Sequence, residues 1–448
     1  MLKNSLYNLL GLILRTGFTF LTVPLLIRLI GVREYGLWTL VSTVLGIVAL
    51  AEGGLSVSTT VFLSQEIATD NRQGISQVLT ITITGMLVLA SLAGLILWAN
   101  SGQILDSFPN LEVNQRLSAA ITLKWGALFI WAKLWQQVMV GVEQAHKRYD
   151  WLNVLNTLQI VASTIGMVAI ASGGGKIVAL MQWQATTALV MLFLHGWVGF
   201  HLLVPYQPKF TWNGGKGWEI WRYSSATWVT SLGSALFQQG DRLIVGSILG
   251  TELLGAYGAI TTVTTQINVF SSIAIQPLLP RLGELLQGSR DRLEYQIKQA
   301  TQANFILGIG LGAFVLLLSP WLIFILFGQY NSQYQLALQL AAIAYALYSL
   351  NAVGYYILLG LGAANISMII VTMSGIFSLL LIIIGAKLWG IAGAGLGNIG
   401  YIGTLSCMAI AMNRLHISPQ KWIGWLHPQE IWLFSQSLLQ KTNLFPLK

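Results

Sequence analysis

Charged residues are scarce in this chain of 448 residues. Asp, Glu, Lys and Arg together make up 9% of it, 55% is hydrophobic, and the mean hydropathy is +0.68. A soluble domain carries about 25% charged residues, so this composition excludes a soluble protein. The apolar runs are about 20 residues long, the length of a membrane-spanning helix rather than of a short barrel strand. We therefore expect an all-α integral membrane protein.

Cysteine is almost absent as well. Cys407 is the single cysteine, so an intrachain disulfide is excluded. No His, Cys and carboxylate cluster has the spacing of metal ligands, and we expect no metal site. The glycines at 395, 397 and 400 match a dinucleotide-binding pattern but lack the surrounding βαβ unit, so we expect no cofactor. The net charge is +9, yet the basic residues are dispersed over short loops, which argues against nucleic-acid binding.

What the chain does contain is a series of apolar runs. They divide it into an N-terminal six-helix bundle (1–203), a cytoplasmic linker (204–221), a C-terminal six-helix bundle (222–413) and an amphipathic cytoplasmic tail (414–448). We expect twelve spans, at 6–29, 36–60, 78–99, 118–141, 152–172, 177–203, 222–248, 252–279, 301–326, 335–359, 365–387 and 391–413.

The two halves contain related motifs. The glycines of 31–38 (GVREYGLW) and 250–257 (GTELLGAY) stand 219 positions apart, and so do Gly141 and Gly360, each near the end of an apolar run. Two matches at one offset indicate a duplicated half. Because each half has an even number of spans, the repeats are expected to be parallel, related by an axis along the membrane normal.

The distribution of Lys and Arg predicts the orientation. With the N-terminus in the cytoplasm, 15 of the 24 basic residues fall on the cytoplasmic side and 5 outside. Cytoplasmic loops carry the excess of basic residues in membrane proteins, so both termini are expected in the cytoplasm.

Charged side chains inside the spans are the candidate functional residues, since each costs about 2.5–3.5 kcal/mol on insertion scales and faces a bundle interior or a wet cavity. Four are basic, and we expect them to line a cationic lumen that binds an anionic substrate. Two are acidic and are candidates for ion coupling, and two neighbouring amides are expected to add polar lumen surface. The basic residues are Arg15, Lys124, Lys133 and Arg242; the acidic ones are Asp241 and Glu52; the amides are Gln238 and Gln239.

Structural roles stay open for several of these side chains. Arg15 could pair with a carboxylate such as Glu52, and Lys124, near the outer end of its span, could extend to the interface. Asp241 and Arg242 point about 100° apart on a helix and are poor partners for each other. For His195 we expect a buried, hydrogen-bonded imidazole, with a proton relay as the alternative.

Several motifs together resemble a known family. They are PLLIRLIG at 24–31, EYG at 34–36, Asp241-Arg242 before an apolar run, GAY at 255–257, PLLPR at 277–281 and GLG at 360–362. In order and spacing they are similar to the Wzx-type polysaccharide repeat-unit flippases of the multidrug/oligosaccharidyl-lipid/polysaccharide (MOP) exporter superfamily, over about residues 1–413.

The resemblance implies a V-shaped pair of bundles that opens alternately to each side of a bacterial inner membrane. The substrate would be an undecaprenyl-diphosphate-linked oligosaccharide for O-antigen or exopolysaccharide, with a polymerase and glycosyltransferases as partners. Arg15, Lys133 and Arg242 would hold the diphosphate-sugar head group.

Three other functions are considered. A multidrug exporter of the same superfamily should prefer cavity carboxylates, whereas four basic and two acidic residues are counted here within the spans. A lipid II flippase would need two further helices beyond twelve. A membrane polymerase or glycosyltransferase would need a large external loop with catalytic groups, and the longest, at 100–117, has only Asp106 and Glu112. We therefore expect a transporter and not an enzyme.

Overall fold

The computed structural model describes residue 17 and residues 20–287 and 289–442, in which every regular element is a helix. The fold is all-α and of the membrane type, as the composition predicts. By its internal contacts the chain divides into two compact units, residues 1–256 and 257–448.

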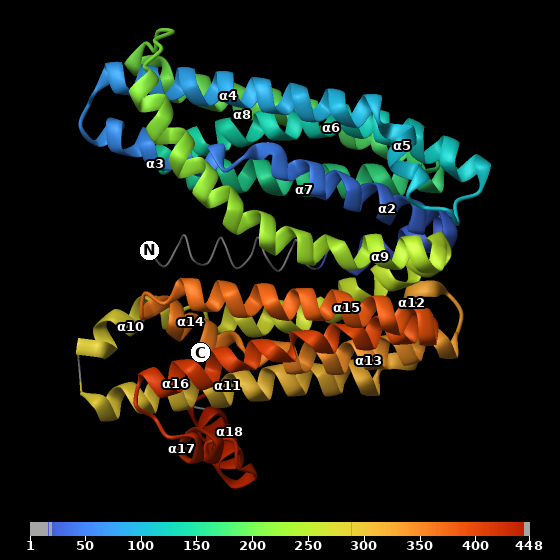
Figure 1. Cartoon of the computed structure of the whole chain (residues 1–448), viewed down its shortest axis with the longest axis vertical. Helices are drawn as coiled ribbons and strands as arrows, with labels where there is room; N and C mark the ends of the chain where they lie inside the picture. Colours follow the sequence, from blue (N-terminus) through green and yellow to red (C-terminus); the bar gives the residue numbers. More distant parts are fainter. Residues whose placement is uncertain (1–16, 18–19, 288, 443–448) are drawn as a thin grey trace, which may run out of the picture. The chain divides into compact units, whose positions relative to one another are not determined.

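Unit 1 is built around one long central helix. This helix, α6, packs against α2, α3, α4 and α8, while α7 lies against α8 (Figure 1). The elements are a helix Phe20–Ile30, α2 (Val32–Val48), η1 (Ala49–Glu52), α3 (Leu55–Ala68), α4 (Arg72–Ala99), α5 (Ser101–Asp106), α6 (Val113–Ala145), α7 (Tyr149–Ser172), α8 (Ile177–Leu203), η2 (Val204–Tyr206) and the first part of α9 (Gly214–Ile275).

Unit 2 contains the remaining helices. Here α13 packs between α11 and α15, and α14 packs against α10 and α16. The elements after α9 are α10 (Leu278–Gln287), α11 (Arg290–Leu317), α12 (Ser319–Phe327), α13 (Ser332–Ser349), α14 (Ala352–Gly360), α15 (Ala364–Gly397), η3 (Asn398–Leu405), α16 (Ser406–Arg414), α17 (Pro419–Gly424) and α18 (Pro428–Thr442).

The expected spans coincide with these helices from 36–60 onward. Within the described residues nine helices are long and apolar enough to cross a membrane. The segment Ala364–Arg414, at 51 residues, is broken at Trp389 and Gly390, so it contains two of the expected spans. α9 is likewise interrupted at Gly250, which adopts φ 81° and ψ 179°. The first expected span, 6–29, lies largely outside the described residues.

The duplicated glycines meet each other in space. A Cβ on Gly36 would overlap the carbonyl oxygen of Thr251, and a Cβ on Gly255 would overlap that of Val32. These two contacts are equivalent. Gly255 lies 219 positions after Gly36, and Thr251 lies 219 positions after Val32. All four residues lie in unit 1, so the start of the second repeat belongs to that unit and the boundary between the compact units falls inside α9.

The second pair of repeated glycines occupies equivalent places in the two units. Gly141 of α6 faces the backbone oxygen of Ser56 and the side chain of Thr59 on α3, while Gly360 of α14 faces Leu282 on α10. In each unit the glycine lets two helices approach closely, the known use of small residues in membrane bundles.

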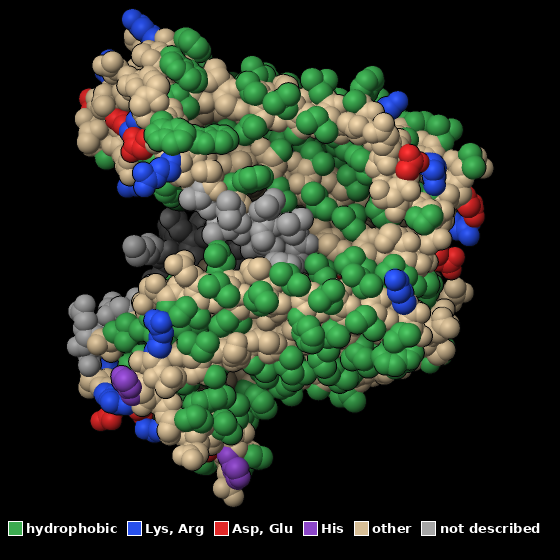
Figure 2. Space-filling view, in the orientation of Figure 1, with side chains coloured by type: hydrophobic (Ala, Val, Ile, Leu, Met, Phe, Trp, Pro, Cys, Tyr) green, Lys and Arg blue, Asp and Glu red, His purple; other side chains and the backbone are tan. Residues whose placement is uncertain are grey.

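On the face drawn in Figure 2, hydrophobic side chains cover the flanks of the helices in each unit, and the Lys, Arg, Asp and Glu side chains lie near the helix ends. The tail helices α17 and α18 pack on α11, where Lys298 Nζ contacts Glu430 at 2.6 Å and Gln302 Nε2 donates to the Trp425 carbonyl at 3.0 Å. Trp432 and Leu433 of α18 are exposed, as expected of an amphipathic segment.

Candidate functional site

A polar cavity lies inside unit 1 among α6, α7 and α8. Its volume is about 410 Å³, and its walls include the apolar side chains of Phe129 and Ile160. The other lining residues are polar or charged: Lys133, Asn156, Gln159, Ser163, Thr164 and Gln184. Because charged and amide groups are expensive in hydrocarbon, a cluster of them marks a wet or substrate-filled space.

The sequence of α7 supplies one wall of this cavity. Asn156, Gln159 and Ser163 follow at intervals of three and four residues, which places them on one face of a helix. The facing positions of α6 are Lys133 and Gln136. Lys133 Nζ donates to Gln159 Oε1 at 3.0 Å, and Gln136 Nε2 donates to the same oxygen at 3.2 Å.

The chemistry of the lining suits an anionic or hydroxyl-rich ligand. The described residues around the cavity include one cation, Lys133, and no carboxylate. An ammonium group with three donors binds a phosphate oxygen, and amide and hydroxyl side chains both donate to and accept from sugar hydroxyls. Lys133, half-buried in the middle of α6, is therefore the charged centre of this site.

The polar residues predicted at 238–242 belong to α9 and lie in unit 1, and those whose side chains are described do not line this cavity. Asp241 is buried, and its Oδ1 accepts a hydrogen bond from the Arg242 backbone N–H at 2.7 Å. The Nε of Arg242 is buried without a hydrogen-bond partner, and Arg242 does not line the cavity of Lys133. The Gln239 amide packs against Gly46 of α2, while the side chain of Gln238 lies outside the described residues.

Glu52 occupies a break between α2 and α3. It ends η1, Gly53 and Gly54 follow with left-handed φ angles of 62° and 74°, and its Oε1 accepts from the Ser56 N–H at 3.3 Å and from the Ser56 hydroxyl. It therefore caps the start of α3, where a carboxylate is favoured. Arg15, which the sequence offered as a partner, lies outside the described residues.

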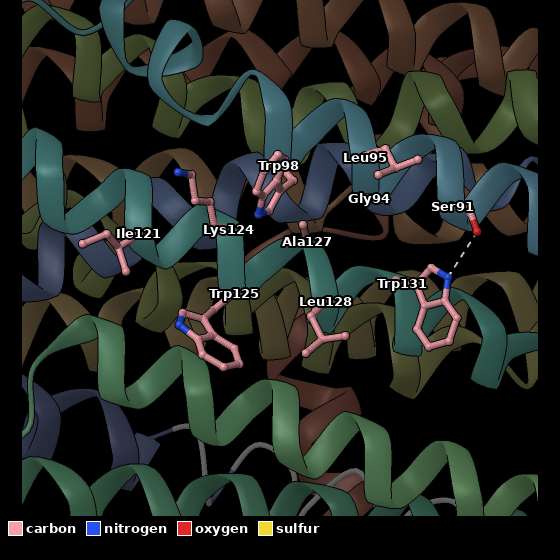
Figure 3. Close-up of a pocket in the computed structure, with 10 residues that line it drawn as sticks. All are labelled: Ser91, Gly94, Leu95, Trp98, Ile121, Lys124, Trp125, Ala127, Leu128 and Trp131. Atoms are coloured by element: carbon pink, nitrogen blue, oxygen red, sulfur yellow. Dashed lines mark hydrogen bonds between the residues drawn. The ribbon is translucent and has the colours of Figure 1, made fainter.

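Lys124 lies in a different environment from Lys133 although both belong to α6. Figure 3 shows it in a groove between α4 and α6 that is lined by Trp98, Trp125 and Trp131. The Lys124 ammonium stands 5.4 Å from the centre of the Trp98 ring, a cation–π contact. The groove measures about 750 Å³, and Trp98 and Trp125 are exposed along it.

Sequence reasoning missed one pair of ionisable residues. Glu143 lies two residues beyond the expected span 118–141, so the sequence alone does not place it among the acidic residues within the spans. It lies in α6, fully buried, and its Oε1 is 2.7 Å from His195 Nδ1 of α8, itself fully buried. The expectation of a buried, hydrogen-bonded His195 is thereby confirmed. One feature of the sequence does indicate Glu143: Lys133, Gln136, Val140 and Glu143 follow at intervals of three and four residues, which places Glu143 on the same face of the helix as Lys133.

Metal-binding clusters are not found where the chain is described. No three His, Cys, Asp or Glu side chains among those residues come together as ligands.

The fold is shared with solved transporters. The lipid II flippase MurJ in an inward closed conformation matches with a TM-score of 0.73 and 12% identity, covering 99% of this chain and 100% of that one. An inward-facing multidrug resistance MATE family transporter of the MOP superfamily matches with a TM-score of 0.69 and 14% identity, covering 92% and 94%. At these identities the likeness shows the fold, and it is the fold of this superfamily.

Sequence comparison finds one relative that matches part of the chain and one family model that matches more than half of it. An uncharacterized membrane protein of Methanocaldococcus jannaschii, MJ1375, is 30% identical over 181 residues. That match includes 40% of this chain and 42% of the relative, so the chain spans less than half of the relative's length. The family model described as "Polysaccharide biosynthesis protein" matches residues 1–286, more than half of the chain. The chain belongs to this polysaccharide biosynthesis family.

Proposed function

We propose that the protein is a flippase that moves an undecaprenyl-diphosphate-linked oligosaccharide from the cytoplasmic to the outer leaflet by alternating access. The family and the MOP fold support a lipid-linked flippase or an exporter. The observation that carries the choice between them is the cavity of Lys133, whose lining joins one cation to amides and hydroxyls and includes no carboxylate among its described residues.

The physical task explains this choice of side chains. A diphosphate cannot cross hydrocarbon without countercharge and hydrogen bonds, so the protein must offer a polar path while the lipid tail stays in the membrane. Lys133 supplies charge to the diphosphate, and Gln159, Asn156 and Gln184 supply hydrogen bonds to the sugars. A negative-inside potential favours outward movement of the anion by about 2.3 kcal/mol per charge per 100 mV.

The remaining predicted residues have roles of the same kind in this proposal. Arg242, with its buried Nε lacking a partner, is a second cation for the head group, and Arg15 is a third. Asp241, Gln238 and Gln239 precede Arg242 in the sequence and are assigned to the same polar lumen. Lys124, in the tryptophan-lined groove, is assigned to the membrane interface instead. Glycosyltransferases would build the lipid-linked oligosaccharide before it is flipped, and a polymerase would act on it afterwards.

The lipid II flippase class stays close to this proposal. The lipid II flippase has the same fold, and a shared fold does not distinguish the two substrates. Both substrates carry a diphosphate, and they differ in their sugars. The polar lining of the Lys133 cavity fits the diphosphate that both substrates carry.

Substitution of Lys133 tests the proposal. In cells where this gene is the only source of the flippase, Lys133→Met should lower export of surface polysaccharide roughly tenfold or more, since a hydrogen bond to a charged group contributes about 1.5–3 kcal/mol. Lys133→Arg should retain most of the export, because it keeps the charge. The matched control is Lys124→Met, on the same helix, which should export normally.

The proposal would be wrong if Lys133→Met, present in the membrane at the normal level, exported as well as the unmodified protein. A direct assay follows the same variants in vesicles that contain a fluorescent polyprenyl-diphosphate-linked oligosaccharide. There, loss of flipping with retained expression separates a transport defect from a folding defect.

A further inference from the structure

Glu143 and His195 form an isolated ionisable pair in the interior of unit 1. Glu143 lies near the end of α6 and His195 on α8, both side chains have no exposed surface, and Nδ1 and Oε1 are 2.7 Å apart. Within the described residues, α6 and α8 pack against each other extensively. The pair therefore lies within a major packing interface of its bundle.

Each partner of the pair also has a polar atom without a partner. Glu143 Oε2 and His195 Nε2 are buried and make no hydrogen bond. With a neutral imidazole and an ionised carboxylate the pair carries one negative charge; with one added proton it is neutral overall; with two it is positive. Of these three states only the one with a single added proton has no net charge, and a net charge is unfavourable in a buried site.

A polar face of α6 connects the pair to the cavity of Lys133. Lys133, Gln136 and Glu143 are separated by intervals that return to one side of the helix, and Gln136 is hydrogen-bonded to Gln159 of the cavity wall. On α8, Gln184 of the cavity and His195 are eleven residues apart, about three full turns. A movement of α6 against α8 would therefore act on both sites.

We propose that Glu143 and His195 form a proton-binding site that couples proton movement to the flipping of the head group. The coupling rests on the proposed function, whereas the proton site itself does not. Opening the α6–α8 interface exposes the pair to water, where it releases its proton, and reclosing requires that a proton be bound again. The only covalent change is transfer of one proton between water and the pair.

A metal cation does not fit this site as well as a proton does. Na⁺ and divalent cations need several oxygen ligands, and among the described residues no third His, Cys, Asp or Glu joins the pair. None of the other titratable groups on α6 or on the elements packed against the pair's two helices hydrogen-bonds to Glu143 Oε2 or His195 Nε2. The titratable groups near these helix ends include His146, whose ring centre lies 5.8 Å from that of Tyr206, the exposed His201 of α8, Lys147, Arg72, and the ion pairs Glu66–Lys216 and Arg148–Asp150.

Infrared difference spectroscopy of the full-length protein in lipid tests the proton site without any substrate. Spectra are compared between about pH 5 and pH 8, the interval in which histidine titrates. We expect a carboxylic-acid or carboxylate band that is absent in Glu143→Gln and whose transition pH shifts in His195→Gln. The matched control is Glu112→Gln, an exposed residue paired with Arg33, in which the band should persist. A spectrum unchanged by Glu143→Gln overturns the proposal.

A second measurement does not need substitution of the pair. The chain has five histidines, and replacing the other four by glutamine leaves ¹⁵N-labelled His195 as a single NMR reporter. Its ring nitrogens should change protonation with pH in the same interval. Constant ¹⁵N shifts across the interval mean a fixed hydrogen bond that only joins α6 and α8, and they refute the proton site.

Transport in vesicles tests the coupling. With the fluorescent polyprenyl-diphosphate-linked oligosaccharide as probe, an imposed pH gradient should change the flipping rate of the unmodified protein severalfold. Glu143→Gln and His195→Gln, which keep a hydrogen bond but cannot titrate as a pair, should lose this response. A normal response in Glu143→Gln refutes the coupling, whereas no flipping by the unmodified protein refutes the proposed function and leaves the spectroscopic result standing.

Discussion

At the scale of single residues, the same chemical group serves different purposes according to the face of the helix that carries it. Lys124 and Lys133 are nine positions apart on α6, which is half a turn beyond two full turns. One contacts Trp98 in an exposed groove, and the other donates to Gln159 in a polar cavity. Sequence position predicts that they cannot share one wall, but only packing decides which of them faces the polar space.

Glu52 gives a prediction at this scale. Because it caps α3 through Ser56, Glu52→Ala should lower the stability by about 1 kcal/mol, the typical effect of losing a cap. Glu52→Gln keeps an oxygen acceptor and should unfold close to the normal temperature. Thermal unfolding in detergent measures both. If Glu52→Gln folds normally but stops export, Glu52 has a role in ion coupling beyond the cap.

At the scale of elements, glycine determines where helices break and where they touch. Gly31 and Gly250, with φ angles of 86° and 81°, occupy equivalent positions in the repeats. Other residues are strained in this region of backbone space. Five residues later, Gly36 and Gly255 allow α2 and α9 to meet backbone to backbone. The sequence showed that these glycines are repeated, and the structure shows that the two copies pack on each other.

This contact predicts a large effect of one added methyl group. Gly36→Ala or Gly255→Ala places a Cβ on backbone atoms that cannot move aside, and overpacking of this kind costs about 1–3 kcal/mol or more. Thermal stability and the yield of folded protein in detergent should both fall. The matched control is Gly196→Ala in α8, where a Cβ meets no atom within 4 Å. Equal stability of Gly36→Ala and Gly196→Ala would contradict this account of the close contact.

At the scale of the whole molecule, the orientation in the membrane is still a prediction from charge. It places Arg72 in the cytoplasm and Lys176 outside, and both side chains are exposed. After replacement of the buried Cys407, the variants Arg72→Cys and Lys176→Cys each carry one thiol. A membrane-impermeant thiol reagent should label the second in intact cells and the first only after permeabilisation. The reverse pattern would invert the topology and with it the direction of flipping.

The sequence by itself determined that this is a helical membrane protein, where nearly all of its spans lie and that its two halves are related. Hydropathy and repeat spacing are local properties of the chain, so they can be read without a fold. The tertiary structure decided which polar groups meet: Lys133 with Gln159, and Glu143 with His195. These partners come from helices whose mutual rotation is set by packing, and no spacing within one helix records that rotation.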